Sequence, residues 1–463
     1  MMRRARKNSK FTCVYMRLAS LKNIVFVTIL LFISCGSSTK DDKKVTQKTN
    51  TATTENILNT EGNIQLKEVS TDSVPKVGRK IDGLSTTHIF TGANQWTEYM
   101  PLLKGKKVGV VANQTSIVND TLEYPQTGEV RAVDFHLVDF LVEMNVDVRK
   151  AYAPEHGFRG KADAGEFLKD GIDVKTRVPI ISIYGKNKKP SPEQLKDIDV
   201  MIFDIQDVGA RFYTYISSLH YVMEACAEAN IPVIVFDRPN PNGSYIDGPI
   251  LEPKHKGFVG MHPIPVVHGM TIGEYAQMIN GEGWLKNKIQ CELKIIGMKN
   301  YSRDMEYSLL EKPSPNLPND TSINLYPSLC FFEGTILSAG RGTEMQFQIF
   351  GGPSLPKETY EFQFTPQANE GSKYPKFKNE ACNGMDLRNH KRVNGINLEW
   401  LIEAYVATGK SKDFFIPYFT TLAGTETLQK QIEQGFTFRE IRTTWLKGLK
   451  DFDQMRQPYL LYE

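Results

Sequence analysis

A short polar segment at residues 154–160 carries three side chains that could do chemistry together. It places the carboxylate of Glu155, the imidazole of His156 and the guanidinium of Arg159 within five residues. Cleavage of a glycosidic bond needs a carboxyl group that protonates the leaving oxygen and a second carboxylate that acts as base or nucleophile. We therefore take Glu155 as the candidate acid of a glycosidase.

Three further polar segments follow predicted strands, at residues 113–116, 204–211 and 237–243. In open parallel sheets, ligands bind at the carboxyl ends of the strands, where the loops converge. Ordinary solvated loops rarely repeat Asp or Glu with Arg at every strand end, so we expect one composite site. Besides Glu155, the residues expected to bind substrate there are Asn113, His156, Arg159, Asp204, Asp207, Arg211, Asp237, Arg238 and Asn240.

The carboxylate that would act with Glu155 is open among four residues. Asp204, Asp207 and Asp237 follow strands of the first domain, and Glu333 lies in the later segment 331–335, beside two phenylalanines. The stereochemical outcome would depend on the distance between the two carboxyl groups, which the sequence does not contain.

Two other chemistries fit these residues less well. Metal-assisted hydrolysis would use Glu155, His156, Asp204, Asp207 and Asp237 as ligands, but the sequence has no H-E-x-x-H motif. Redox chemistry with a dinucleotide would require G-x-G-x-x-G after the first strand, where the chain has Asn-Gln-Thr instead. We expect neither a metal ion nor a cofactor.

Arginines are a second feature of the predicted site. Arg341 lies between two glycines in residues 337–344, and it adds to Arg159, Arg211 and Arg238. Some of these guanidinium groups must pair with nearby aspartates. One that remains would bind a substrate carboxylate through two parallel hydrogen bonds.

The elements that position these residues follow from hydrophobic patterning, because β-branched apolar runs alternate with amphipathic helical segments. Strands are predicted at residues 107–112, 146–152, 179–183, 199–204 and 231–236, and crossover helices at 133–144 and 217–229. Capping boxes at Ser191, Thr271 and Thr437 mark three helix starts. We expect an α/β fold, with a Rossmann-like, doubly wound parallel-sheet domain over 85–280 and a smaller α+β domain over 281–463 that completes the cleft.

The N-terminal region predicts export and anchoring. Residues 24–33 are mostly apolar, follow Arg17 and Lys22, and are too few to span a bilayer, as in a signal peptide. The run ends in F-I-S-C-G, which resembles a bacterial lipobox, so residues 1–35 are the predicted signal and Cys35 the predicted lipidation site. Residues 36–80 are polar and predict a disordered tether. The expected location is therefore exported and lipid-anchored, in the periplasm or at the outer membrane.

The net charge and the cysteines of the chain argue against a nucleic-acid-binding protein and against a disulfide-rich one. The formal net charge of +3 includes several positive charges in the first 22 residues, so the mature chain is near neutral and no nucleic-acid partner is expected. Of six cysteines, four follow the predicted signal, in apolar or strand-like stretches that predict buried free thiols.

Several motifs together resemble one known family. These are P-E-H-G-F-R-G at 154–160, D-I-Q-D-V-G-A-R-F-Y-T-Y at 204–215, D-R-P-N-P at 237–241, F-E-G-T at 332–335 and G-R-G-T at 340–343. In order along roughly 85–463, they resemble the NamZ family of exo-β-N-acetylmuramidases, glycoside hydrolase family 171. Glu344 and Met345 depart from the usual residues after the last motif, which puts only fine substrate preference in doubt.

The resemblance implies an enzyme that removes N-acetylmuramic acid from the non-reducing end of peptidoglycan fragments. It implies an active site between a Rossmann-like domain and a smaller C-terminal domain, with a catalytic glutamate carried over to Glu155 and to Glu333. The expected partners are muramic-acid oligosaccharides, and the lactyl carboxylate of that sugar would account for the surplus of arginines, including Arg341. The alternatives are a non-catalytic lipoprotein that binds muropeptides and a metal-dependent hydrolase.

Overall fold

The computed structural model describes residues 89–124, 129–160 and 170–463. The predicted signal peptide, Cys35 and the predicted tether lie outside these residues. In the described part of the chain, every helix is too short or too polar to span a lipid bilayer.

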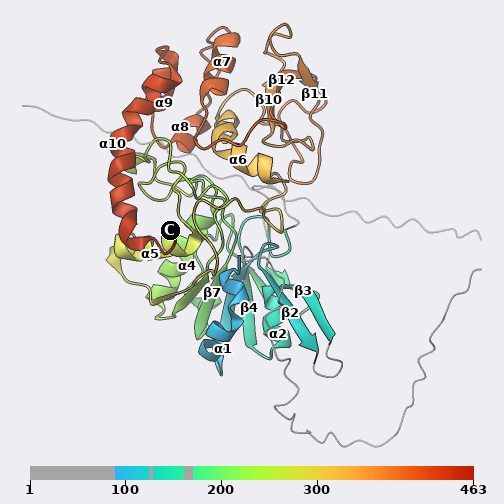
Figure 1. The fold of residues 1–463 in the computed structure, drawn as a ribbon, viewed down its shortest axis with the longest axis vertical. Helices are drawn as coiled ribbons and strands as arrows, with labels where there is room; N and C mark the ends of the chain where they lie inside the picture. The colour runs from blue at the N-terminus through green and yellow to red at the C-terminus, as the bar shows by residue number, and fades with distance from the viewer. Residues whose placement is uncertain (1–88, 125–128, 161–169) are drawn as a thin grey trace, which may run out of the picture. The chain divides into compact units, whose positions relative to one another are not determined.

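A seven-stranded sheet forms the first part of the fold (Figure 1). Its strand order is β5-β6-β4-β1-β7-β8-β9, and every neighbouring pair is parallel except β5 with β6. The bounds are β1 Lys107–Ala112, β4 Asp147–Ala153, β5 Gly171–Ile172, β6 Pro179–Ser182, β7 Val200–Asp204, β8 Val233–Phe236 and β9 Leu293–Ile296. Without β5, this is the doubly wound order 3-2-1-4-5-6, which confirms the predicted fold class.

The sheet is buried on both faces because alternate residues of each strand point to opposite sides. Val200 and Ile202 of β7 belong to one hydrophobic cluster, which includes residues of helices α1 (Trp96–Leu103) and α2 (Leu137–Glu143). Met201 and Phe203 belong to another, with helices α4 (Tyr215–Glu228) and α5 (Ile272–Gly281). This pattern explains why the strands read as continuous apolar runs.

Two sequence-based boundaries differ from the structure. The helix predicted over 133–144 begins only at Leu137, because β3 (Glu129–His136) pairs antiparallel with β2 (Ile117–Tyr124). The ring of His136 then accepts a hydrogen bond from the amide of Val138 and caps α2. Strand β9 lies beyond residue 280, so the sheet continues past the predicted end of the first domain.

The remaining elements form the second part of the fold (Figure 1). A three-stranded antiparallel sheet has the order β10-β12-β11. The bounds are β10 Ile349–Gly352, β11 Phe362–Phe364, β12 Cys382–Asp386, α6 Asp320–Leu329, α7 Glu399–Ala407, α8 Tyr418–Ala423, α9 Thr427–Glu433 and α10 Phe438–Arg456. The predicted α+β character of this part is confirmed.

Three helices begin at the predicted capping boxes. Ser191, Thr271 and Thr437 each form a complete capping box, which begins α3 (Pro192–Leu195), α5 and α10 respectively. The four cysteines at 226, 291, 330 and 382 are buried and free, as predicted.

Candidate active site

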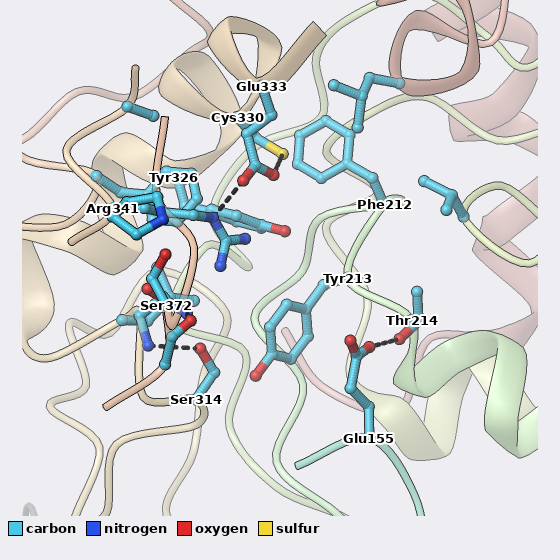
Figure 2. A pocket seen from close by; sticks show the side chains of 18 of the residues that line it. Glu155, Phe212, Tyr213, Thr214, Ser314, Tyr326, Cys330, Glu333, Arg341 and Ser372 are labelled. Atoms are coloured by element: carbon cyan, nitrogen blue, oxygen red, sulfur yellow. Dashed lines mark hydrogen bonds and ion pairs between the residues drawn. The ribbon is translucent and has the colours of Figure 1, made fainter. Parts of the chain in front are cut away.

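A cavity of about 710 Å³ combines loops of the first part of the fold with turns and helices of the second (Figure 2). This volume lies within the range of small-molecule sites. Its wall is formed by Glu155, His156, Tyr184, Phe212, Tyr213, Thr214, Phe258, Val259, Ser314, Asn316, Leu317, Tyr326, Cys330, Glu333, Leu337, Ser338, Ala339, Arg341, Phe347, Gly371, Ser372, Lys373, Tyr374, Pro375, Lys376, Tyr418 and Leu422. Of the predicted site residues, the structure brings together Glu155, His156, Glu333 and Arg341.

Glu155 is held by hydrogen bonds at both carboxylate oxygens. It lies just beyond the carboxyl end of β4, and its Oε1 accepts a hydrogen bond of 2.7 Å from the Tyr184 hydroxyl. Its Oε2 accepts one of 2.8 Å from the hydroxyl of Thr214, the residue before α4 (Figure 2). The carboxyl group therefore has one defined orientation in the cavity wall.

The backbone after Glu155 adopts an uncommon conformation. His156 has φ of 69° and Gly157 has φ of 80°, so two successive residues are left-handed. Non-glycine residues rarely adopt this backbone conformation, and those that do are often found at functional sites. The turn leaves His156 only 5% exposed, with its side chain in the wall of the cavity next to Glu155.

The second glutamate comes from the other part of the fold. Glu333 lies in the 3-10 helix η5 (Cys330–Gly334), and its Oε1 accepts a hydrogen bond from Nε of Arg341. Its Oε2 is 3.6 Å from Sγ of Cys330, which donates to it (Figure 2). Although burial alone would lower the pKa of Arg341, the Glu333 carboxylate keeps that pKa above its ordinary value.

Glycines are required on both sides of Arg341. Gly340 and Gly342 both have φ of 81°. A Cβ atom at Gly340 would lie 2.7 Å from the side chain of Ile349, and one at Gly342 would lie 2.7 Å from the carbonyl oxygen of Gln367. Only glycine fits these positions, and the close backbone turn directs the guanidinium to Glu333.

Lys376 supports the turn that carries Glu333, and the sequence did not predict it. Its Nζ donates to the carbonyl oxygens of Thr335 at 2.6 Å, Leu337 at 3.0 Å and Glu333 at 3.2 Å. Burial lowers the pKa of this ammonium group. Because one partly buried cation binds the carbonyls of residues 333, 335 and 337, the backbone of Glu333 has little freedom to move.

Arg159 does not line the cavity, contrary to its predicted role. Its guanidinium makes two ion pairs, at 2.9 Å with Asp139 of α2 and at 2.8 Å with Asp173. Burial opposes ionisation of Asp173, but hydrogen bonds from Arg159 and Thr176 lower its pKa to about 2. The arginine therefore joins the segments around the turn.

Asp204 and Arg238 form a buried ion pair and also lie outside the cavity wall. Nε and Nη2 of Arg238 donate to the two carboxylate oxygens of Asp204 at 2.6 and 2.8 Å. The two side chains are 0% and 4% exposed. Both groups were predicted to bind substrate, but the bidentate pair uses their hydrogen-bonding capacity within the core.

Asp237 is likewise structural. Its carboxylate accepts hydrogen bonds from the hydroxyls of Thr271 and Tyr462 and from the amide of Gly273. Burial raises its pKa to about 6. It therefore joins the end of β8 to the start of α5 and to the C-terminal segment.

The other four predicted residues form hydrogen bonds with backbone groups or side chains inside the fold. Arg211 is fully buried and donates to the carbonyls of residues 249, 264, 422 and 423, which connects the two parts of the fold. Asn240 donates to the carbonyl of Met270, Asp207 accepts from the amide of Gly209, and Asn113 donates to the Tyr215 hydroxyl. None of the four lines the cavity.

The structure does not bring the five residues of the metal-binding alternative together. Of its five supposed ligands, Asp204 is paired with an arginine and Asp237 with hydroxyls and an amide, whereas Glu155 and His156 face the cavity. Within the ranges that the structure describes, no group of three or more His, Cys, Asp or Glu side chains is placed to hold a metal ion.

Fold and site together define an α/β enzyme with two carboxylates in one cleft, the arrangement that glycoside hydrolysis requires. Family models for the N-terminal and C-terminal domains of the exo-β-N-acetylmuramidase NamZ match residues 108–321 and 324–462. The peptidoglycan β-N-acetylmuramidase NamZ of Bacillus subtilis strain 168 is 37% identical over an alignment of 392 residues that covers 79% of this chain and 89% of that protein. The chain belongs to the NamZ family of exo-β-N-acetylmuramidases and is a glycosidase.

Two solved structures share the fold. Both are DUF1343 family proteins from Bacteroides fragilis NCTC 9343. The first is 43% identical with a TM-score of 0.73, and the match covers 81% of this chain and 99% of that structure. The second is 30% identical with a TM-score of 0.67, and the match covers 81% of this chain and 100% of that structure. These relationships favour neither the non-catalytic binding protein nor the metal-dependent hydrolase.

Proposed function

We propose that this glycosidase releases N-acetylmuramic acid from the non-reducing end of peptidoglycan fragments, with Glu155 as the proton donor and Glu333 as the second carboxylate. One observation carries the proposal. Two glutamates from different parts of the fold line one cavity, and each carboxylate is oriented by its own hydrogen bonds. Paired carboxyl groups around the scissile bond are what glycoside hydrolysis requires.

The side chains around the two glutamates suit the steps of such a reaction. Glu155 would give its proton to the glycosidic oxygen, and the hydroxyls of Tyr184 and Thr214 would hold the carboxylate that remains. Glu333 would face the positive charge that develops on the sugar ring. Arg341 donates a hydrogen bond to the Glu333 carboxylate and places a positive charge beside it.

Arg341 also suits recognition of the lactyl carboxylate of muramic acid. Its Nε binds Glu333, and its other guanidinium nitrogens extend into the cavity (Figure 2). Arg159, Arg211 and Arg238 are engaged elsewhere, so among the predicted arginines this role falls to Arg341. Planar guanidinium groups bind carboxylates through two parallel hydrogen bonds.

Exo action agrees with the depth of the cavity. The wall contains side chains that are almost fully buried, such as Tyr326, Cys330 and Phe347, whereas Tyr374 in the same wall is 90% exposed. A cavity with a buried apolar inner wall accommodates the end of a glycan chain better than its middle.

The direction of cleavage tests the substrate. We expect the enzyme to release free N-acetylmuramic acid from the disaccharide with that sugar at the non-reducing end, linked β-1,4 to N-acetylglucosamine. The isomer with the two sugars exchanged should remain intact, because its terminal sugar lacks the lactyl carboxylate that Arg341 would bind. Chromatography with mass spectrometry measures both reactions. Cleavage of both disaccharides at similar rates, or of neither, would refute the proposal.

We further propose that the protein is exported and anchored through a lipid on Cys35. The support is the charged and then apolar segment that ends in F-I-S-C-G. The full-length protein should incorporate a radiolabelled fatty acid and sediment with membranes, whereas a Cys35→Ser variant should incorporate none. Cys13→Ser is the matched control and should behave as the wild type. Equal labelling of wild type and Cys35→Ser would exclude lipidation at this residue.

A further inference from the structure

Two aromatic side chains in the cavity wall have no catalytic role so far. Tyr374 lines the cavity although its side chain is 90% exposed, which places it at the mouth. Phe258 lines the same cavity from a turn in which the amide of Gly257 donates to the carbonyl of Gly260 at 2.8 Å. A large aromatic side chain exposed at the mouth of a cavity is typical of a ligand-contacting surface.

Contacts between aromatic rings connect Phe258 to the candidate proton donor. The Tyr184 hydroxyl donates to Glu155, and the ring of Tyr184 lies 6.2 Å from that of Phe258, centroid to centroid. The ring of Tyr221 is nearly parallel to Phe258 at 6.3 Å, and the ammonium of Lys188 lies 5.0 Å from the Phe258 centroid. Tyr221 and Lys188 do not line the cavity, so they contact Phe258 from behind. The rest of the Phe258 ring faces the cavity.

The position of the acid decides which part of a substrate these rings would meet. A proton donor must contact the glycosidic oxygen, so its neighbours on the leaving side contact the departing sugar. Phe258 is a neighbour of Glu155, because a single ring separates the two side chains. When the terminal sugar lies inside the cavity, the part of the chain that emerges past Tyr374 at the mouth is the leaving group.

We propose that Tyr374 and Phe258 form a subsite for the leaving-group sugars of the glycan chain, with the apolar C–H faces of the sugar rings packed on the two aromatic rings. This inference rests on the proposed function, because it takes Glu155 as the proton donor. The subsite would select a sugar chain as leaving group over a small one.

Substrates with and without a leaving-group sugar test the subsite. The disaccharide with N-acetylmuramic acid β-linked to N-acetylglucosamine has one, whereas the β-fluoride of N-acetylmuramic acid has a single atom in its place. In Tyr374→Ala and in Phe258→Ala we expect kcat/KM for the disaccharide to fall about 2- to 10-fold, the size of an aromatic packing contact, mainly through a higher KM. Hydrolysis of the fluoride should change less than about 2-fold, since no packing contact is lost. Tyr374→Phe should retain activity on both.

The controls separate failure of the subsite from failure of the proposed function. Phe436→Ala removes an exposed aromatic ring outside the cavity wall and should change neither substrate. Tyr374 is exposed, so loss of the fold does not explain an effect of its substitution. Equal losses on both substrates, or no loss in either variant, would overturn the subsite alone. If the wild-type enzyme cleaves neither substrate, the proposed function itself fails.

Discussion

In a Glu155→Gln variant, we expect kcat/KM for the muramic acid disaccharide to fall by about 10²- to 10⁴-fold, the usual contribution of a general acid. Glutamine keeps the shape of the side chain. Its amide oxygen can accept one of the two hydrogen bonds from Tyr184 and Thr214, and its amide nitrogen can donate to the other hydroxyl oxygen, so the fold should be retained. What it lacks is a proton to give to the leaving oxygen. Initial rates with the disaccharide, together with circular dichroism of the variant, measure this effect.

The leaving group distinguishes proton donation from other roles of Glu155. Fluoride departs without a general acid, so hydrolysis of the β-fluoride of N-acetylmuramic acid should be far less impaired in Glu155→Gln than hydrolysis of the disaccharide. Glu193→Gln is a matched control, because Glu193 is 86% exposed on the short helix α3, and it should have wild-type activity. Full activity of Glu155→Gln on the disaccharide would remove Glu155 from the mechanism.

Replacement of Arg238 by methionine should have the largest effect on stability. It removes the cation that pairs with the fully buried carboxylate of Asp204. Burial already raises the pKa of Asp204, and Arg238 opposes that rise. Loss of one partner of a buried pair costs about 3–5 kcal/mol, because the other charge remains desolvated. Urea unfolding followed by fluorescence should show this decrease in the free energy of unfolding.

Two comparisons isolate the buried pair. Arg149→Met breaks a half-exposed pair with Asp147 and should change stability little. The double variant Asp204→Leu/Arg238→Met removes both charges and should recover much of the loss. An Arg238→Met protein with wild-type stability and a raised KM would instead restore the original prediction, that Arg238 binds substrate.

Much of the fold could be predicted from local patterns. The strands β1, β4, β6, β7 and β8 lie within a residue or two of the predicted ranges, because a parallel strand covered on both faces requires a continuous apolar run. The three capping boxes also agree, since each involves residues only three positions apart. The edge strand β9 and the hairpin strands β2 and β3 were missed.

The two glutamates proposed to be catalytic could also be selected from the sequence. Glu155 follows a predicted strand, and Glu333 follows two phenylalanines. Both line the cavity. Tyr184, Thr214 and Lys376, which orient the two glutamates, carry no local signal of this role. Each contacts its partner from at least 29 residues away.

The sequence by itself therefore determined the class of fold and included both cavity glutamates among its candidates, whereas the export signal stays a prediction. Tertiary structure alone decided which charged residues line the cavity and which form hydrogen bonds inside the fold. Strand ends are rich in Asp and Arg whether these residues bind substrate or stabilise the fold. Arg211, Arg238 and Asp204 are enclosed by the core, where a buried charge must find hydrogen-bond partners, so their capacity is used internally. Arg341 extends into the cavity instead, because the glycines beside it turn the backbone toward Glu333.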